Sequence, residues 1–250
     1  MQLFRGHLLP LRLGEGLSPA RIGLPDAMPA CPKAGKCELA PVNRTDPLPP
    51  FEDGLVLTAE CKRQVAHGVQ HILSAVSGHI DEQGTRGTPG RVARMYDELL
   101  AGYKVDPQAL VNNALFDVEY DEMVIVKDID FHSLCEHHML PFYGRVHVGY
   151  LPVKKVIGLS KIPRMVEMFA RRLQVQERMT QQVAGFLDET VKPMGVGVVV
   201  EAVHLCAVMR GVKKPGSVMV TSAVRGGFKD NPATREEFMS HVRQRFTANI

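Results

Sequence analysis

An almost unbroken apolar stretch at 195–209, GVGVVVEAVHLCAVM, constrains the fold of this chain more than any other feature. It is rich in valine, whose branched side chain favours extended backbone, so we expect a buried strand here. Two further stretches, 123–131 and 144–151, alternate apolar and polar residues as half-buried strands do. No apolar run approaches the roughly 20 residues that a membrane-spanning helix needs, which argues against a membrane protein.

Apolar residues at helical spacing surround these strands. One such pattern ends at Gly78, and a second begins at Thr88, the expected N-cap, and ends near Gly102. Ser160 is the expected cap of a third helix, and a fourth has an apolar stripe between 175 and 187. This order of elements predicts the α+β class, with helices covering a mostly antiparallel sheet.

Prolines are concentrated in the first 54 residues, which show no sustained helical or strand period. Proline removes a backbone donor and fixes φ. We therefore expect a poorly ordered leader at 1–54 and a globular domain at 55–250.

Charge and cysteine content narrow the class of protein. Thirty Lys and Arg against 27 Asp and Glu leave a net charge of +3, too small for a protein that coats nucleic acid. The five cysteines are scattered and odd in number. That pattern favours a reducing cytoplasm, where a cysteine is a metal ligand or a core residue, over a disulfide framework.

Two clusters of cysteine and histidine offer metal ligands. Cys135 and His138 are three residues apart on a turn after a strand, and His204 and Cys206 are two apart on the apolar strand, where both should point the same way. A thiolate from each cluster and one imidazole make a set of two cysteines and one histidine for Zn²⁺. Three protein ligands leave a fourth position for water, as catalytic zinc sites do.

Two histidines remain beside this expected site, His137 and His204. An imidazole with a pKa near 6.5 suits proton transfer at neutral pH, so both are candidate catalytic residues. The spacing leaves open whether His137 or His138 is the ligand. Cysteine or histidine clusters of this kind also occur as ordinary core and surface residues.

Basic residues near a helix start offer a phosphate site. Ser160 and Lys161 open the third helix, Arg164 follows one turn later, and the even-numbered face of the apolar strand, continued, reaches Arg210. A helix N-terminus flanked by cations favours phosphate. A solvated helix end with surface charges is the alternative.

QVQER at 174–178 places Gln176 and Glu177 early in the fourth helix. A carboxylate that accepts two parallel N–H bonds matches the edge of guanine, which presents a ring N–H beside an amine. A solvated helix face is the alternative for these residues taken alone.

Together these motifs resemble the GTP cyclohydrolase I family. The likeness covers about residues 55–247, and CEHH, QVQER and HLC occur in the order of the family. The matching segments are TPGRVARMYDELLAGY (88–103), FHSLCEHHMLPFYGRVHVGYLP (131–152), VIGLSKIPRMVEMFARRLQVQERMTQQ (156–182), VHLCAVMRGVKKPGS (203–217) and TSAVRGGF (221–228).

The resemblance implies a role for each matching position. It implies a zinc-dependent hydrolase that converts GTP and water to 7,8-dihydroneopterin triphosphate and formate, by opening the purine at C8, rearranging the ribose and closing the pterin ring. The implied zinc ligands are Cys135, His138 and Cys206, and the implied proton carriers are His137, His204 and Ser160. Glu177 and Gln176 are the implied guanine contacts, and the implied ribose and triphosphate contacts are Ser160, Lys161, Arg164 and Arg210. Arg91 and Arg94 match residues that reach a neighbouring subunit's site.

The resemblance also implies the tunnelling fold, an antiparallel sheet with helices on one face preceded by N-terminal helices, assembled into a homodecamer. The cytoplasmic location is expected from the cysteine pattern. Its substrate partner is GTP, and no nucleic acid or membrane partner is expected. A structural-zinc scaffold and a GTP-binding module without turnover remain as alternatives. A zinc nucleotide deaminase does not fit, because the chain has no CxxC motif.

Overall fold

A computed structural model describes residues 57–244 of the chain. The leader expected at 1–54 lies outside the described residues, so its extent and the domain boundary at residue 55 remain predictions. Among the helices described, none is long and apolar enough to span a membrane.

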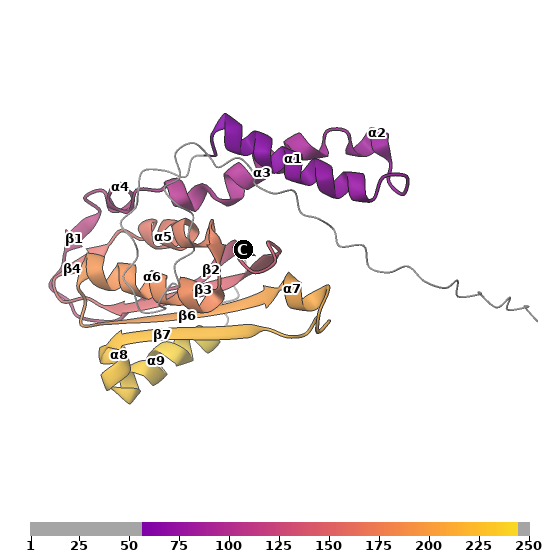
Figure 1. The fold of residues 1–250 in the computed structure, drawn as a ribbon. Helices are drawn as coiled ribbons and strands as arrows, with labels where there is room; N and C mark the ends of the chain where they lie inside the picture. The colour runs from indigo at the N-terminus through magenta and orange to yellow at the C-terminus, as the bar shows by residue number, and fades with distance from the viewer. Residues whose placement is uncertain (1–56, 245–250) are drawn as a thin grey trace, which may run out of the picture. The chain divides into compact units, whose positions relative to one another are not determined.

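A five-stranded sheet forms the centre of the described fold (Figure 1). Its order is β5-β2-β3-β6-β7, and all neighbours are antiparallel except β5, which runs parallel to the end of β2. A separate antiparallel pair joins β1 and β4. The strands are β1 (Leu115–Asp117), β2 (Val124–Cys135), β3 (Pro141–Leu151), β4 (Lys155–Ile157), β5 (Leu173–Gln174), β6 (Gly195–His204) and β7 (Met219–Gly226).

Helices precede, connect and follow these strands. Their bounds are α1 (Ala59–Ala75), α2 (Glu82–Thr85), α3 (Thr88–Leu99), the 3₁₀ turn η1 (Ala101–Lys104), α4 (Pro107–Val111), α5 (Lys161–Ala170), α6 (Gln176–Val191), α7 (Leu205–Val208), α8 (Gly227–Asp230) and α9 (Pro232–Arg243). The expected α+β class, with N-terminal helices before the sheet, is confirmed.

The main core lies between the sheet and the helices α5 and α6. Alternate residues of β3 and β6, such as Val146 and Val198, point to this side and are fully buried with Met165 and Phe169 of α5. Burial of these side chains supplies most of the driving force for this packing, since each contributes roughly 1.5–3 kcal/mol. The apolar stretch that begins at residue 195 is therefore a central strand, as predicted.

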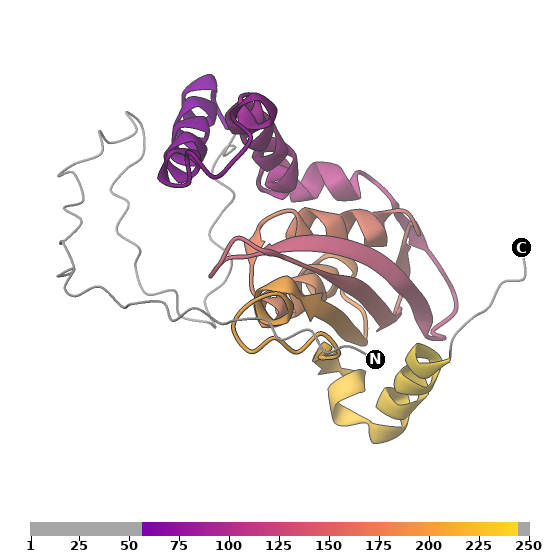
Figure 2. The same ribbon diagram turned by 90° about the vertical axis from the view of Figure 1, so that its right-hand side faces the viewer.

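The opposite face of the sheet is also covered in part, which the sequence reading did not include. Helices α8 and α9 lie against it (Figures 1 and 2). Gly149 and Gly197 are paired across β3 and β6. A Cβ on Gly149 would stand 2.8 Å from the ring of Phe238, and one on Gly197 would stand 2.7 Å from the ring of Phe228. Glycine at both positions makes room for the two aromatic rings.

Three local expectations need correction. The strand at 195–209 ends at His204, because its ladder with β3 pairs His204 with Phe142 and the next partner, Pro141, has no N–H to donate. Residues Leu205–Val208 form the short helix α7 instead. Gly87, not Thr88, is the N-cap of α3, and Ser160 stands at the N-cap of α5 without a capping hydrogen bond from its side chain.

The turn η1 is held tightly against the end of α5. Gly102 donates its N–H to the carbonyl of Arg171 over 2.9 Å and accepts a hydrogen bond from the guanidinium of Arg172. Arg172 is buried and also lies over the rings of Tyr103 and Phe169. A Cβ on Gly102 would come within 2.2 Å of the carbonyl oxygen of Met168.

Gly102→Ala should lower the free energy of unfolding by about 2–3 kcal/mol, because the added methyl group forces the backbone of η1 away from α5. Gly68→Ala in α1 is the matched control, since a Cβ there meets nothing within 4 Å. This variant should raise the free energy of unfolding by about 0.5–1 kcal/mol through helix propensity. Denaturant unfolding measures both, and equal effects of the two substitutions would contradict the close approach.

Candidate metal centre

The tight turn between β2 and β3 carries the CEHH motif. Cys135 is the last residue of β2 and is buried. Its carbonyl accepts the N–H of Met139 over 2.7 Å, and its own N–H donates to Leu140 over 2.9 Å. Met139 takes a left-handed backbone conformation, with φ at 55°. The chain therefore reverses directly after Cys135, and Glu136, His137 and His138 lie on the turn.

The segment 174–178 holds this turn in place through hydrogen bonds and an ion pair, which sequence reasoning missed. Glu136 donates its N–H to the carbonyl of Gln174 over 3.0 Å, and its carboxylate pairs with Arg178 of α6. Arg178 also donates to the side chain of Gln174 over 3.1 Å. QVQER therefore fixes the position of CEHH. The motif was visible in the sequence, but its helical spacing alone did not show which side chains face the turn.

Cys135, His138 and Cys206 form the predicted metal group. One ligand atom from each lies within 4.8 Å of the others, and the sulfur of Cys135 is 3.9 Å from Nδ1 of His138. Zinc bonds of about 2.3 Å to sulfur and 2.0–2.1 Å to nitrogen put tetrahedral ligand atoms roughly 3.5–3.8 Å apart, so small movements would bring this set around one ion. Cys206 comes from α7, not from a strand face as expected.

The charge balance of this group also fits a cation. Burial raises the pKa of the Cys206 thiol, and the neighbouring Cys135 raises it further. Two thiols this close cannot both ionise easily without a positive charge between them. A bound Zn²⁺ supplies that charge and stabilises both thiolates.

His137 and His204 stand on two sides of the metal group. The side chain of His137 is 65% exposed, with Nδ1 3.8 Å from the sulfur of Cys135. His204 is the last residue of β6, and its ring stacks on Phe142 with centroids 4.6 Å apart. Burial lowers the pKa of His204, while the nearby carboxylate of Glu177 raises it. His137 is therefore open to solvent, whereas the ring of His204 is held against Phe142.

The start of α6 presents one exposed and one buried polar side chain. Glu177 is exposed in the first turn, and its carboxylate makes no ion pair with the residues that the structure describes. Gln176 is 0% exposed, and its side-chain oxygen lies 2.8 Å from Nε2 of His204. Only Glu177 is therefore open to a ligand in one chain.

Arg210 lies beside the metal group, but not on a continued face of β6 as the sequence predicted. Because α7 interrupts the strand, Arg210 follows a turn rather than a continued strand face. Its guanidinium lies 3.0 Å from Nε2 of His138 and can only donate, so Nε2 accepts here. A metal ion on Nδ1 would leave the hydrogen on Nε2, and Arg210 would then have to give up this contact.

Apart from Arg210, the predicted phosphate residues are not near the metal group of the same chain. Ser160 and Lys161 lie at the start of α5, where Lys161 donates to the carbonyl of Leu110 over 2.7 Å. The end of α5 leads into β5, which pairs with Cys135. Ten helical residues span about 15 Å, so the two groups lie near opposite ends of this helix. Figure 1 shows α7 and the β1–β4 pair correspondingly far apart.

The remaining predicted cations also lie elsewhere. Arg164 is exposed one turn into α5. Arg91 in α3 donates to the carbonyl of Gly84 over 3.0 Å, and the guanidinium of Arg94 lies near Gly90 in the same helix. One chain therefore brings together the metal ligands, both histidines, Gln176, Glu177 and Arg210. It does not bring the other five basic or hydroxyl residues to this group, which are Ser160, Lys161, Arg164, Arg91 and Arg94.

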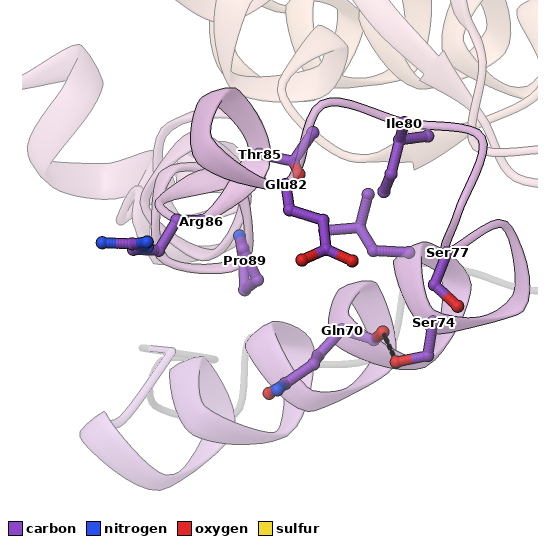
Figure 3. Close-up of a pocket in the computed structure, with 9 residues that line it drawn as sticks. Gln70, Ser74, Ser77, Ile80, Glu82, Thr85, Arg86 and Pro89 are labelled. Carbon is purple, nitrogen blue, oxygen red and sulfur yellow. Dashed lines mark hydrogen bonds between the residues drawn. The ribbon is translucent and has the colours of Figure 1, made fainter.

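Two surface hollows were found away from this centre. One of about 400 Å³ lies among α1, α2 and the start of α3, where Glu82 points into it (Figure 3). The other, of about 680 Å³, lies beside α4 and is lined in part by Lys155 and Phe186. Neither contains a residue of the metal group.

Residues 65–243 match the family described as GTP cyclohydrolase I. The chain is 53% identical over 175 residues to GTP cyclohydrolase 1 of Leptospira biflexa, covering 70% of this chain and 96% of the relative. It is 51% identical over 175 residues to GTP cyclohydrolase 1 of Wolinella succinogenes, covering 70% and 94%.

Among solved structures, an archaeosine synthase QueF-Like in the apo form aligns with a TM-score of 0.37 and 20% identity. The alignment covers 44% of this chain and 98% of that one.

Zinc retention tests the ligand set. The purified protein should hold about one Zn²⁺ per chain, and Cys206→Ser should lose most of it, because a neutral hydroxyl is a far weaker zinc ligand than a thiolate. Cys61→Ser, which changes a free cysteine of α1, should keep the metal. Metal analysis after dialysis measures the content, and full retention by Cys206→Ser would remove this residue from the set.

Proposed function

Because this chain belongs to the GTP cyclohydrolase I family, we propose that the residues around Cys135 form the hydrolytic half of its active site. The enzyme converts GTP and water to 7,8-dihydroneopterin triphosphate and formate, the first step of folate biosynthesis. The observation that carries the residue assignment is the meeting of Cys135, His138 and Cys206 within 4.8 Å, beside two histidines that are not needed as ligands.

Cys135, His138 and Cys206 would hold Zn²⁺, which would supply a Lewis acid for the hydrolysis at C8 of the purine. His137 is exposed beside the sulfur of Cys135, where it can donate a proton to the purine nitrogen as the ring opens. His204, on the other side, serves as a second proton carrier. Glu177 accepts the ring N–H and the amine of guanine, which distinguishes guanine from adenine.

The triphosphate half of the site belongs, in our proposal, to a second copy of the chain. Ser160, Lys161 and Arg164 would supply it from the start of α5, and Arg91 and Arg94 would reach a neighbour's site. The length of α5 supports this, since Ser160 and Lys161 stand at one end of a helix about 15 Å long whose other end leads to the strand paired with Cys135.

Exposed apolar side chains and an open sheet edge also favour a homo-oligomer. Strand β7 pairs only with β6 among the described strands, and Val220 on it is exposed. Ile72 of α1 and Leu159 before α5 are 68% and 70% exposed. Apolar surface and unpaired edges of this kind are usually covered by a partner. A decamer is the expected assembly, and free thiols at the metal group favour a cytoplasmic location.

Turnover of GTP tests the function directly. Zinc-loaded protein incubated with GTP should release formate and form a fluorescent pterin, and His137→Ala should abolish both while keeping its zinc, because it loses a proton donor and not a ligand. Loss of zinc in this variant would exchange the roles of His137 and His138. Bound GTP without formate would indicate a binding module, and a wild-type protein with zinc but neither product would end the assignment.

Mixed oligomers test the shared site. His137→Ala and Lys161→Ala should each be inactive alone, because one damages the metal half and the other the triphosphate half. After the two proteins are unfolded and refolded together, about a quarter of the sites should combine two intact halves from different copies, so part of the activity should return. Zinc-loaded mixtures that stay inactive while forming full-size oligomers would place both halves in one chain.

A further inference from the structure

Gln176 stands out among the polar residues near the metal centre because it is fully buried and all its polar atoms are used. Its amide nitrogen donates to the carbonyls of Val200 and Met219, each over 3.0 Å, and to the hydroxyl of Thr221 over 3.1 Å. Carbonyl oxygens can only accept, so the atom that faces them must be the NH₂ group. The orientation of this amide is therefore determined by its surroundings.

The opposite atom of the same amide faces His204. The oxygen Oε1 of Gln176 lies 2.8 Å from Nε2 of His204 and can only accept a hydrogen bond. Nε2 must therefore carry a hydrogen. A neutral imidazole has one donor and one acceptor nitrogen, so the lone pair of the neutral ring is on Nδ1.

We propose that Gln176 is a positioning residue that holds the imidazole of His204 in one orientation beside the metal group and in the tautomer with hydrogen on Nε2, which leaves the lone pair of the neutral ring on Nδ1. This inference rests on the proposed role of His204 as a proton carrier. It assigns the tautomer and the orientation of that histidine, which the assignment of the active site leaves open.

Two contacts together hold the imidazole in one orientation. The ring of Phe142 lies parallel to it, with an angle of 3° between the planes, which fixes the plane of the imidazole. The hydrogen bond from Nε2 to Gln176 fixes the rotation of the ring within that plane. A general acid or base that is held in one tautomer needs no rearrangement before it transfers a proton.

The geometry separates this role from contact with guanine. Gln176 has no exposed surface, and its NH₂ group is occupied by three acceptors. Glu177, the next residue, is exposed. The two neighbouring residues at the start of α6 thus have different roles. Glu177 is available to bind the substrate, whereas Gln176 binds His204.

Kinetics of Gln176→Met test the inference, since methionine has a similar length but makes neither hydrogen bond. In zinc-loaded protein, kcat should fall about 100-fold, within the usual range for a general acid or base, while KM for GTP changes less than about threefold and the zinc content is unchanged. Thr221→Val is the matched control. It removes one acceptor of the same amide without touching His204, and its kcat should stay within about threefold of wild type.

Three kinetic outcomes would overturn the inference. A raised KM with unchanged kcat in Gln176→Met would make the residue a substrate contact. An unchanged kcat would show that the hydrogen bond is not needed. An equal loss in Thr221→Val would mean that the buried network acts only through stability.

A second measurement does not depend on activity or on a variant of Gln176. In protein labelled with ¹⁵N in its histidine rings, the signal that disappears in His204→Asn belongs to His204, and in wild type it should have the pattern of a ring protonated at Nε2. A pattern of protonation at Nδ1 would overturn the inference. Wild-type protein that makes no pterin would instead overturn the proposed function, and the ring signal would still report the tautomer.

Discussion

The antiparallel pairing of β3 with β6 is the interaction on which the metal centre depends. It places His204 opposite Phe142, near the start of β3, and the turn that carries Cys135 and His138 directly precedes that start. The two cysteines are far apart in the sequence but meet because this register leaves no alternative. A shift of one residue would move every side chain of β6 to the other face of the sheet.

The end of this pairing is as important as its register. Proline at position 141 offers no N–H to the residue after His204, so β6 stops there and the chain turns into α7. That turn carries Cys206 toward Cys135. A longer strand would have continued past the metal group, and the short helix is therefore part of the way the site is built.

Much of this arrangement was predictable from the sequence. Apolar patterns gave the class, the central strand and the main helices, and the residue types at CEHH and HLC indicated a metal site. The end of the strand at His204, the cover of the second face by α8 and α9, and the support of the turn by Gln174 and Arg178 were missed. Each depends on a partner distant in sequence, and local spacing carries no information about which side chain a distant segment meets.

The length of α5 has a consequence for how the protein gains its activity. In the shared site that we propose, the metal ligands and the phosphate contacts lie near opposite ends of this helix, so a single folded chain lacks a complete site. On that proposal, catalysis would begin only when copies associate, and isolated subunits would not consume GTP. A copy that is damaged in only one half would still complete a neighbour's site with its intact half. A misfolded copy, which lacks both halves, would impair two sites.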